Sequence, residues 1–154
     1  MPGMEQFKVI EISANLFSQE GCSYAHCISE DCNMRAGIAL QFARNFVDFR
    51  EDVMKEEPSV GNVISLKRKD GHHVFNLVTK QKYWQKPKYQ DLEQCLINLK
   101  FQMYELGVTA LAIPRLGCGL DNLCWPNVKC MIERIFAHSA ADIKITVCNP
   151  LGNK

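Results

Sequence analysis

The stretch PRLGCGLD, residues 114–121, follows the short apolar run at residues 110–113 and precedes an amphipathic segment that begins at Trp125. This order predicts a strand, a glycine-rich loop and a helix. Glycine has no Cβ, so such a loop lets backbone N–H groups approach an anion closely. Asp121 adds a titratable carboxylate at the end of the loop. The pattern therefore favours an enzyme that acts on a nucleotide-like ligand.

Apolar periodicity along the rest of the chain predicts an α/β fold. Strands are expected at residues 7–12, 23–28, 60–66, 73–78, 110–113 and 143–147. Helices are expected from Ala36, at residues 92–106 and after Pro126, and the first should continue through residues 48–57. Gly107 is placed to cap the second helix, and the residues at 69–71 predict a hairpin. Strands that alternate with helices around one hairpin predict a mixed sheet covered by helices on both faces.

Length and composition indicate one ordinary globular domain, residues 1–154 with a core at about 7–148, without repeats or linkers. The net charge of +1 excludes a global field that would require a nucleic acid or an anionic membrane as partner. No apolar run approaches the ~20 residues of a membrane span, and the first residues lack a signal-peptide pattern. We expect an intracellular monomer, in the nucleus or the cytoplasm, without a membrane partner.

Eight cysteines raise the question of a metal site or disulfides. They form no Cys-x-x-Cys pair, and no histidine pair matches them at zinc spacing. We therefore expect free thiols, no metal and no cofactor.

Four motifs in one register resemble one branch of the macro domains, over residues 7–147. The branch is that of terminal ADP-ribose protein glycohydrolase, also described as an O-acetyl-ADP-ribose deacetylase. The motifs are AHCISEDC (25–32), Met34 with AGIA (36–39), VTK (78–80) and the loop at 114–121. The resemblance implies a single macro domain, a three-layer α/β/α structure with a central mixed sheet.

The resemblance also implies a cleft for ADP-ribose at the ends of the central strands. Lys80 would attack the anomeric carbon, and Asp121 would handle the protons. The loop would wrap the diphosphate and distal ribose, with the adenine end at Asn15 and the tail near Pro150. The implied substrate-binding residues are Asn15, Leu16, Ser29, Ala36, Gly37, Arg115, Leu116, Gly117, Cys118, Gly119, Leu120 and Pro150.

The chemistry of Lys80 and Asp121 can be weighed on its own. Lys80 ends an apolar run, where a lysine is ordinarily a solvated strand terminus. Partial burial and the like charge of Lys82 would favour the neutral amine that a nucleophile needs. Asp121 could simply cap the following helix. Because a carboxylate near Lys80 would stabilise the ammonium, we expect Asp121 to act as a base toward a ribose hydroxyl or water.

Other reactive side chains have plainer interpretations. His26 lies in an apolar run, so we interpret it as a hydrogen-bonded core group rather than a general base. Cys118 has no histidine placed to form a thiolate, and we expect its backbone N–H to contribute instead. Tyr83 and Trp84, in the basic loop at residues 81–88, could stack on a base or contact a modified protein. An exposed loop without a nucleic-acid role is the favoured interpretation.

The chain departs from the family motifs at three places. Asn15 stands where the family has aspartate, and an uncharged carbonyl acceptor is expected to weaken affinity for adenine or relax base preference. Arg35 replaces a glycine, which costs about 1 kcal/mol or more if the backbone there needs a positive φ. Otherwise its guanidinium could pair with a phosphate or a leaving carboxylate. The tail at 148–150 lacks the tyrosine of the branch, so we expect less stacking there.

The primary hypothesis is a hydrolase that removes mono-ADP-ribose from acidic residues of proteins and also deacylates O-acyl-ADP-ribose. A second hypothesis is a reader that binds ADP-ribose, its protein adducts or poly-ADP-ribose without turnover. A third is removal of ADP-ribose from modified nucleic acid, which the lysines around Trp84 fit weakly.

Overall fold

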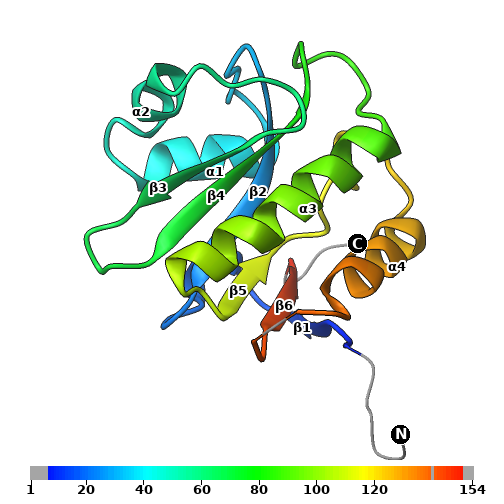
Figure 1. Ribbon diagram of the computed structural model, residues 1–154. Helices are drawn as coiled ribbons and strands as arrows, with labels where there is room; N and C mark the ends of the chain where they lie inside the picture. The colour runs from blue at the N-terminus through cyan, green and yellow to red at the C-terminus, as the bar shows by residue number, and fades with distance from the viewer. Residues whose placement is uncertain (1–6, 140, 151–154) are drawn as a thin grey trace, which may run out of the picture.

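The computed structural model describes residues 7–139 and 141–150. Strands and helices alternate along most of the chain (Figure 1). In order, the elements are β1 (Ile10–Ser13), the 3-10 helix η1 (Leu16–Ser18), β2 (Ser23–Ser29), α1 (Gly37–Asn45), α2 (Phe49–Lys55), β3 (Val63–Lys67), β4 (His73–Lys80), α3 (Tyr89–Leu106), β5 (Ala110–Ile113), α4 (Trp125–Phe136) and β6 (Lys144–Asn149).

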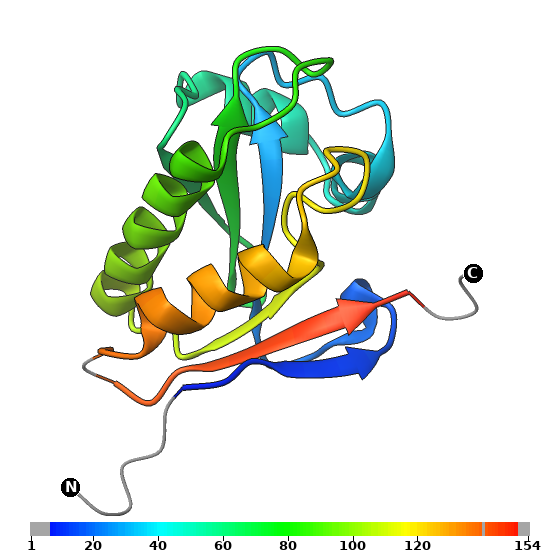
Figure 2. The same ribbon diagram turned by 90° about the vertical axis from the view of Figure 1, so that its right-hand side faces the viewer.

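The six strands form one mixed sheet in the order β1-β6-β5-β2-β4-β3. Strands β1, β6, β5, β2 and β4 run parallel, and only β3 pairs antiparallel, with β4. The carboxyl ends of five strands therefore meet at one edge of the sheet, as Figure 2 shows for β2, β4, β5 and β6. In open α/β sheets this edge is where ligands bind.

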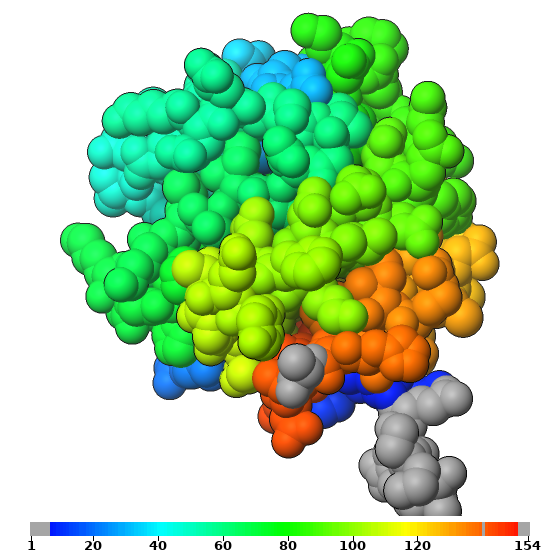
Figure 3. Space-filling model, viewed as in Figure 1, coloured from blue at the N-terminus to red at the C-terminus, as the bar shows by residue number. Residues whose placement is uncertain are grey.

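Helices cover both faces of the sheet. Successive side chains of β4 point to opposite faces of the sheet. Leu77 packs in the core under α3 and α4, and Val78 packs in the core under α1 and α2. Figure 3 shows the side chains of α3 and α4 meeting over one face. The predicted three-layer α/β/α architecture is confirmed.

Most predicted elements are confirmed within a few residues at their ends. Gly107 ends α3 with φ 69°, and Pro126 lies in the first turn of α4. The continuous helix predicted from Ala36 through residues 48–57 is wrong. The chain leaves α1 at Phe46, passes through a left-handed Asp48 with φ 58° and starts a separate helix α2. Aspartate tolerates this conformation, and hydrophobic periodicity does not report it.

His26 is a core residue, as the favoured interpretation predicted. Its ring is fully buried, stacks on Phe42 at a centroid distance of 3.9 Å and places Nε2 2.5 Å from Asn76 Oδ1. Burial lowers the pKa of His26 from 6.5 to about 4, against the smaller opposing effect of the Asn76 hydrogen bond. A neutral, inaccessible imidazole is excluded as a general base in the cleft.

This buried histidine is expected to make the protein less stable in acid. The unfolded chain takes up a proton near pH 6.5 and the folded chain only near pH 4, so stability is full above 6.5 and is lost as the pH falls toward 4. The loss attributable to His26 is about 3 kcal/mol. Urea unfolding of wild type and His26→Gln, at neutral pH and at the acid end of this window, measures it. Glutamine keeps a donor for Asn76 without titrating, so an equal acid loss in both proteins would contradict the assignment.

No helix in the described part of the chain is long and apolar enough to cross a membrane. Within residues 7–139 and 141–150, no three histidine, cysteine, aspartate or glutamate side chains gather as a metal site requires. All eight cysteines fall inside these ranges and carry free thiols.

Candidate active site

A cleft of about 1220 Å³ lies at the edge where the five parallel strands end. It collects residues from the ends of β1, β6, β5, β2 and β4, together with the start of α1 and the loop after β4. All fourteen residues predicted for the site line this one cleft: Asn15, Leu16, Ser29, Ala36, Gly37, Lys80, Arg115, Leu116, Gly117, Cys118, Gly119, Leu120, Asp121 and Pro150. Their placement follows from the parallel topology, whereas their chemical roles remain predictions.

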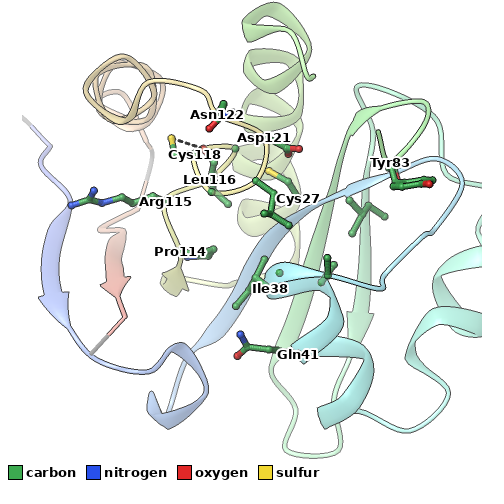
Figure 4. A pocket seen from close by; sticks show the side chains of 18 of the residues that line it. Cys27, Ile38, Gln41, Tyr83, Pro114, Arg115, Leu116, Cys118, Asp121 and Asn122 are labelled. Carbon is green, nitrogen blue, oxygen red and sulfur yellow. Dashed lines mark hydrogen bonds between the residues drawn. The ribbon is translucent and has the colours of Figure 1, made fainter. Parts of the chain in front are cut away.

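The glycine loop forms one wall of the cleft (Figure 4). Gly117 has φ 71°, a conformation that favours glycine, and a Cβ there would lie 2.8 Å from Leu123 Cδ1, so the Leu123 side chain would have to shift. The Leu123 N–H donates to the Gly117 carbonyl at 2.8 Å and closes the loop. At its tip, the N–H groups of residues 119–121 donate to no acceptor within the described part of the chain. They are available to an anion in the cleft.

Cys118 does not serve as predicted in this conformation. Its N–H donates to the Arg115 carbonyl at 3.0 Å, within the loop itself, so the neighbouring amides replace it as free donors. Burial raises the pKa of the Cys118 thiol to about 11. The thiol contacts the Leu116 carbonyl at 3.2 Å. A protonated thiol held this way is a poor nucleophile, as expected.

The start of α1 forms the opposite wall. Ala36, its N-cap, has no side-chain cap, and the first intrahelical bond runs from the Leu40 N–H to the Ala36 carbonyl. The N–H groups of residues 37–39 therefore have no acceptor among the described residues. Gly37 has φ 62°, and a Cβ there would lie 3.2 Å from Leu120 Cδ1 of the facing loop. Two sets of unpaired amides thus flank the cleft, an arrangement that suits a diphosphate.

The Arg115 side chain extends away from the cleft, toward β1 (Figure 4). Its guanidinium lies 3.8 Å from Glu11 and 5.7 Å from the centre of the Trp125 ring. Glu11 also pairs with Lys129 at 2.9 Å. The Lys129 hydrogen bond, although opposed by partial burial, lowers the pKa of Glu11. Arg115 therefore contributes its backbone to the cleft, while its guanidinium lies behind the loop beside Glu11.

Lys80 and Asp121 form an ion pair at the end of the cleft, with Nζ 2.5 Å from Oδ1. Their side chains are only 12% and 17% exposed, and Lys80 Nζ also donates to the Tyr83 carbonyl at 2.8 Å. The plain alternatives are wrong, because Lys80 is not a solvated strand end and Cys124, not Asp121, is the N-cap of α4. The pair joins an amine to a proton acceptor in a site that excludes most water.

Asp31 supports the site from outside the cleft and was not among the predicted site residues. Its Oδ1 accepts from the Ser29 hydroxyl and the Asn33 N–H, and its Oδ2 accepts from the Tyr83 N–H at 3.0 Å. Burial acts to raise the pKa of Asp31, but these three hydrogen bonds together lower it. Asp31 thereby fixes Tyr83, whose carbonyl accepts from Lys80. The signals in the sequence were its place in the motif at residues 25–32 and in a polar loop directly after a strand.

The register between β2 and β4 shifts after Ile28, which leaves Thr79 as an extra residue in β4 and brings Ser29 opposite Lys80. Residues 83–86 of the loop after β4 line the side of the cleft next to Lys80. Tyr83 and Trp84 line it with 55% and 70% of their surfaces exposed. The loop is exposed, as predicted, and it also lies beside the ion pair.

The structure shows where the residues lie that differ from the family motifs. Arg35 is exposed, is not among the residues with positive φ and lines a separate depression of about 340 Å³ with Asp31 and Arg50. It is therefore neither strained nor part of the cleft. Asn15 lines the cleft, and its Oδ1 accepts from the Phe17 N–H at 2.8 Å. Pro150, the last residue described, is exposed at the same end.

No protein-family model matches the chain, but known proteins named as ADP-ribose glycohydrolases or as macrodomains are similar to it. Human ADP-ribose glycohydrolase OARD1 is 43% identical over 144 residues, which is 93% of this chain and 92% of that protein. The DNA ADP-ribosyl glycohydrolase of Thermus aquaticus is 30% identical over 78% of this chain and 35% of its own length. The macrodomain of Thermus aquaticus DarG has a TM-score of 0.83 at 25% identity, covering 92% of this chain and 98% of that one.

Proposed function

The chain belongs to the macro domain family, and on that premise we propose that it is a hydrolase that releases mono-ADP-ribose from modified acidic residues of proteins. The same site would deacylate O-acyl-ADP-ribose, because that compound also joins an acyl group to the ribose. The name of the human relative, an ADP-ribose glycohydrolase, supports hydrolysis of an ADP-ribose bond. The acidic-residue linkage and the roles of the residues are our proposals.

The observation that carries the proposal is the shielded pair of Lys80 and Asp121 beside two sets of unpaired amides. The amides of the glycine loop and of the α1 start would hold the diphosphate. This places the ribose with the reacting carbon at the end of the cleft where Lys80 lies. A module that only binds ADP-ribose has no need for a buried amine at that position.

In the proposed reaction, Asp121 accepts a proton from the Lys80 ammonium as the substrate displaces water. The neutral amine then forms a bond to the anomeric carbon, and the bond from that carbon to the glutamyl oxygen breaks, which releases the side chain as a carboxylate. The adduct nitrogen loses a proton to solvent, and Asp121 returns its own proton to the ring oxygen as the ribose ring opens to a protonated imine. Asp121, again a carboxylate, then accepts a proton from water as the water adds to the imine carbon. It passes that proton to the nitrogen, the carbon–nitrogen bond breaks to free the lysine amine, and the aldehyde closes to free ADP-ribose.

A second candidate is removal of ADP-ribose from DNA, favoured by the resemblance to the bacterial DNA-acting relative. The exposed Trp84 beside the cleft and the lysines of its loop suit a single strand. This candidate requires binding of modified DNA that weakens steeply with salt. A reader without turnover is the remaining alternative.

One assay separates these functions. The protein is incubated with a glutamate-ADP-ribosylated protein and, in parallel, with ADP-ribosylated single-stranded DNA, while calorimetry measures ADP-ribose binding. We expect release from the modified protein. Release from DNA alone would support the second candidate, and tight binding without release from either substrate would identify a reader.

A further inference from the structure

The end of the cleft opposite Lys80 is formed where β1 and β6 stop. The Ala14 N–H donates to the Asn149 carbonyl at 2.9 Å, and Ala14, Asn15, Leu16, Asn149 and Pro150 line the cleft there. Asn15 follows β1 and Lys80 ends β4, four places away in the sheet. At ~4.8 Å per strand, this separates the two ends by about 19 Å, enough for an extended nucleoside diphosphate ribose.

The position of the nucleobase rests on the function proposed above. If the reacting ribose lies at Lys80 and the diphosphate lies between the two sets of amides, the nucleobase must lie at the Asn15 end. This end presents the apolar side chain of Leu16 and the ring of Pro150 together with amide groups. Its recognition chemistry therefore depends on which atoms of those amides face the ligand.

The orientation of the Asn15 amide is determined by the backbone beside it. As N-cap of η1, Asn15 accepts a hydrogen bond from the Phe17 N–H at 2.8 Å, and an N–H donor requires the oxygen to face it. The NH₂ group therefore occupies the other side of the amide. It donates to no acceptor among the residues that the structure describes.

A second unused group lies at the end of the neighbouring strand. Asn149 Oδ1 is buried and accepts no hydrogen bond in the described part of the chain. Asn149 also lines the cleft. Because this oxygen is buried, it is closed to a ligand, and the exposed Asn15 NH₂ group is the free polar group that a base would meet.

We propose that Asn15 makes the nucleobase end of the cleft a hydrogen-bond donor, so that it accepts 6-oxopurines at least as well as adenine. Hypoxanthine presents an acceptor at O6, which complements the free NH₂ group of Asn15. Adenine presents the reverse, an amino donor at C6 and an acceptor at N1. A carboxylate in place of the Asn15 amide would accept from that amino group, which makes this one position a determinant of base preference.

Calorimetry with ADP-ribose and with inosine diphosphate ribose, on wild type and on Asn15→Asp, tests the proposal. Wild type is expected to bind the inosine compound with equal or higher affinity. The aspartate variant is expected to shift the ratio of the two Kd values by roughly 10-fold toward ADP-ribose, the effect of one charge-assisted hydrogen bond. Asn127→Asp is the matched control, because it adds the same charge at an exposed position of α4 outside the cleft.

The outcomes are distinguishable. A clear preference of wild type for ADP-ribose, or an unchanged ratio in Asn15→Asp, would overturn the inference and leave the proposed hydrolase intact. Failure of wild type to bind either compound would overturn the proposed function and this inference with it. A shifted ratio in Asn15→Asp, absent in Asn127→Asp, supports it.

Discussion

Replacing Lys80 by arginine is expected to abolish release of ADP-ribose from a glutamate-modified protein while ADP-ribose binding stays within a few-fold of wild type. Arginine keeps a cation beside Asp121, so the shielded pair survives. A guanidinium stays protonated in proteins and cannot attack the anomeric carbon. Loss of a nucleophile lowers turnover by roughly 10³- to 10⁶-fold. Single-turnover release and calorimetry on the same preparations measure the two effects.

The exposed neighbour Lys82 provides the control, because Lys82→Arg makes the same substitution two residues away. It is expected to keep the wild-type rate. Borohydride reduction during turnover should also link ADP-ribose to Lys80 in wild type, and peptide mass spectrometry would locate the adduct. A Lys80→Arg protein that retains most of the wild-type rate would rule out the lysine as nucleophile.

The second large effect is expected for Asp121→Asn. The amide matches the carboxylate in size and can still accept from Lys80 Nζ, so the loop should keep its conformation. It cannot take up the proton that the lysine must lose before it attacks. Turnover should fall by roughly 10²- to 10⁴-fold, the usual contribution of a positioned acid or base.

Asp142→Asn is the matched control, since Asp142 is exposed and outside the cleft. Single-turnover release and calorimetry on the same preparations distinguish a lost proton acceptor from a damaged loop. A damaged loop would weaken ADP-ribose binding, whereas loss of the proton acceptor alone would lower turnover and leave binding unchanged. If Asp121→Asn turned over as fast as wild type, the proton would have to leave through another group.

Most of the architecture could be predicted because its periodicities are strong. Local sequence signals predicted three features that the structure contains. These are the hairpin turn, the Gly107 cap and the apolar face of α3. The break between α1 and α2 could not be predicted in the same way. It depends on the left-handed Asp48, and no hydrophobic pattern records the sign of φ at one residue.

The membership of the cleft was predictable, but the direction of its side chains was not. Parallel strands bring their carboxyl ends to one edge, so residues that follow those strands must meet there. Arg115 turns outward because Glu11, about a hundred residues earlier in the chain, and the ring of Trp125 lie behind it. This direction depends on a partner that only the folded chain brings close. Asn15 instead turns its oxygen to the nearby Phe17 N–H, a local contact whose consequence for the cleft becomes visible only in the structure.

The two walls of the cleft meet closely, with Gly37 of one wall facing Leu120 of the other. Between them the ligand would be gripped by main-chain amides, so the middle of the cleft depends on chain path and hardly on side-chain identity. Substitutions at Asn15 or around Lys80 would therefore change which base or bond is recognised. They would leave in place the main-chain amides that hold the phosphates. Diversification of specificity would concentrate at the two ends of the cleft, while the centre is inherited.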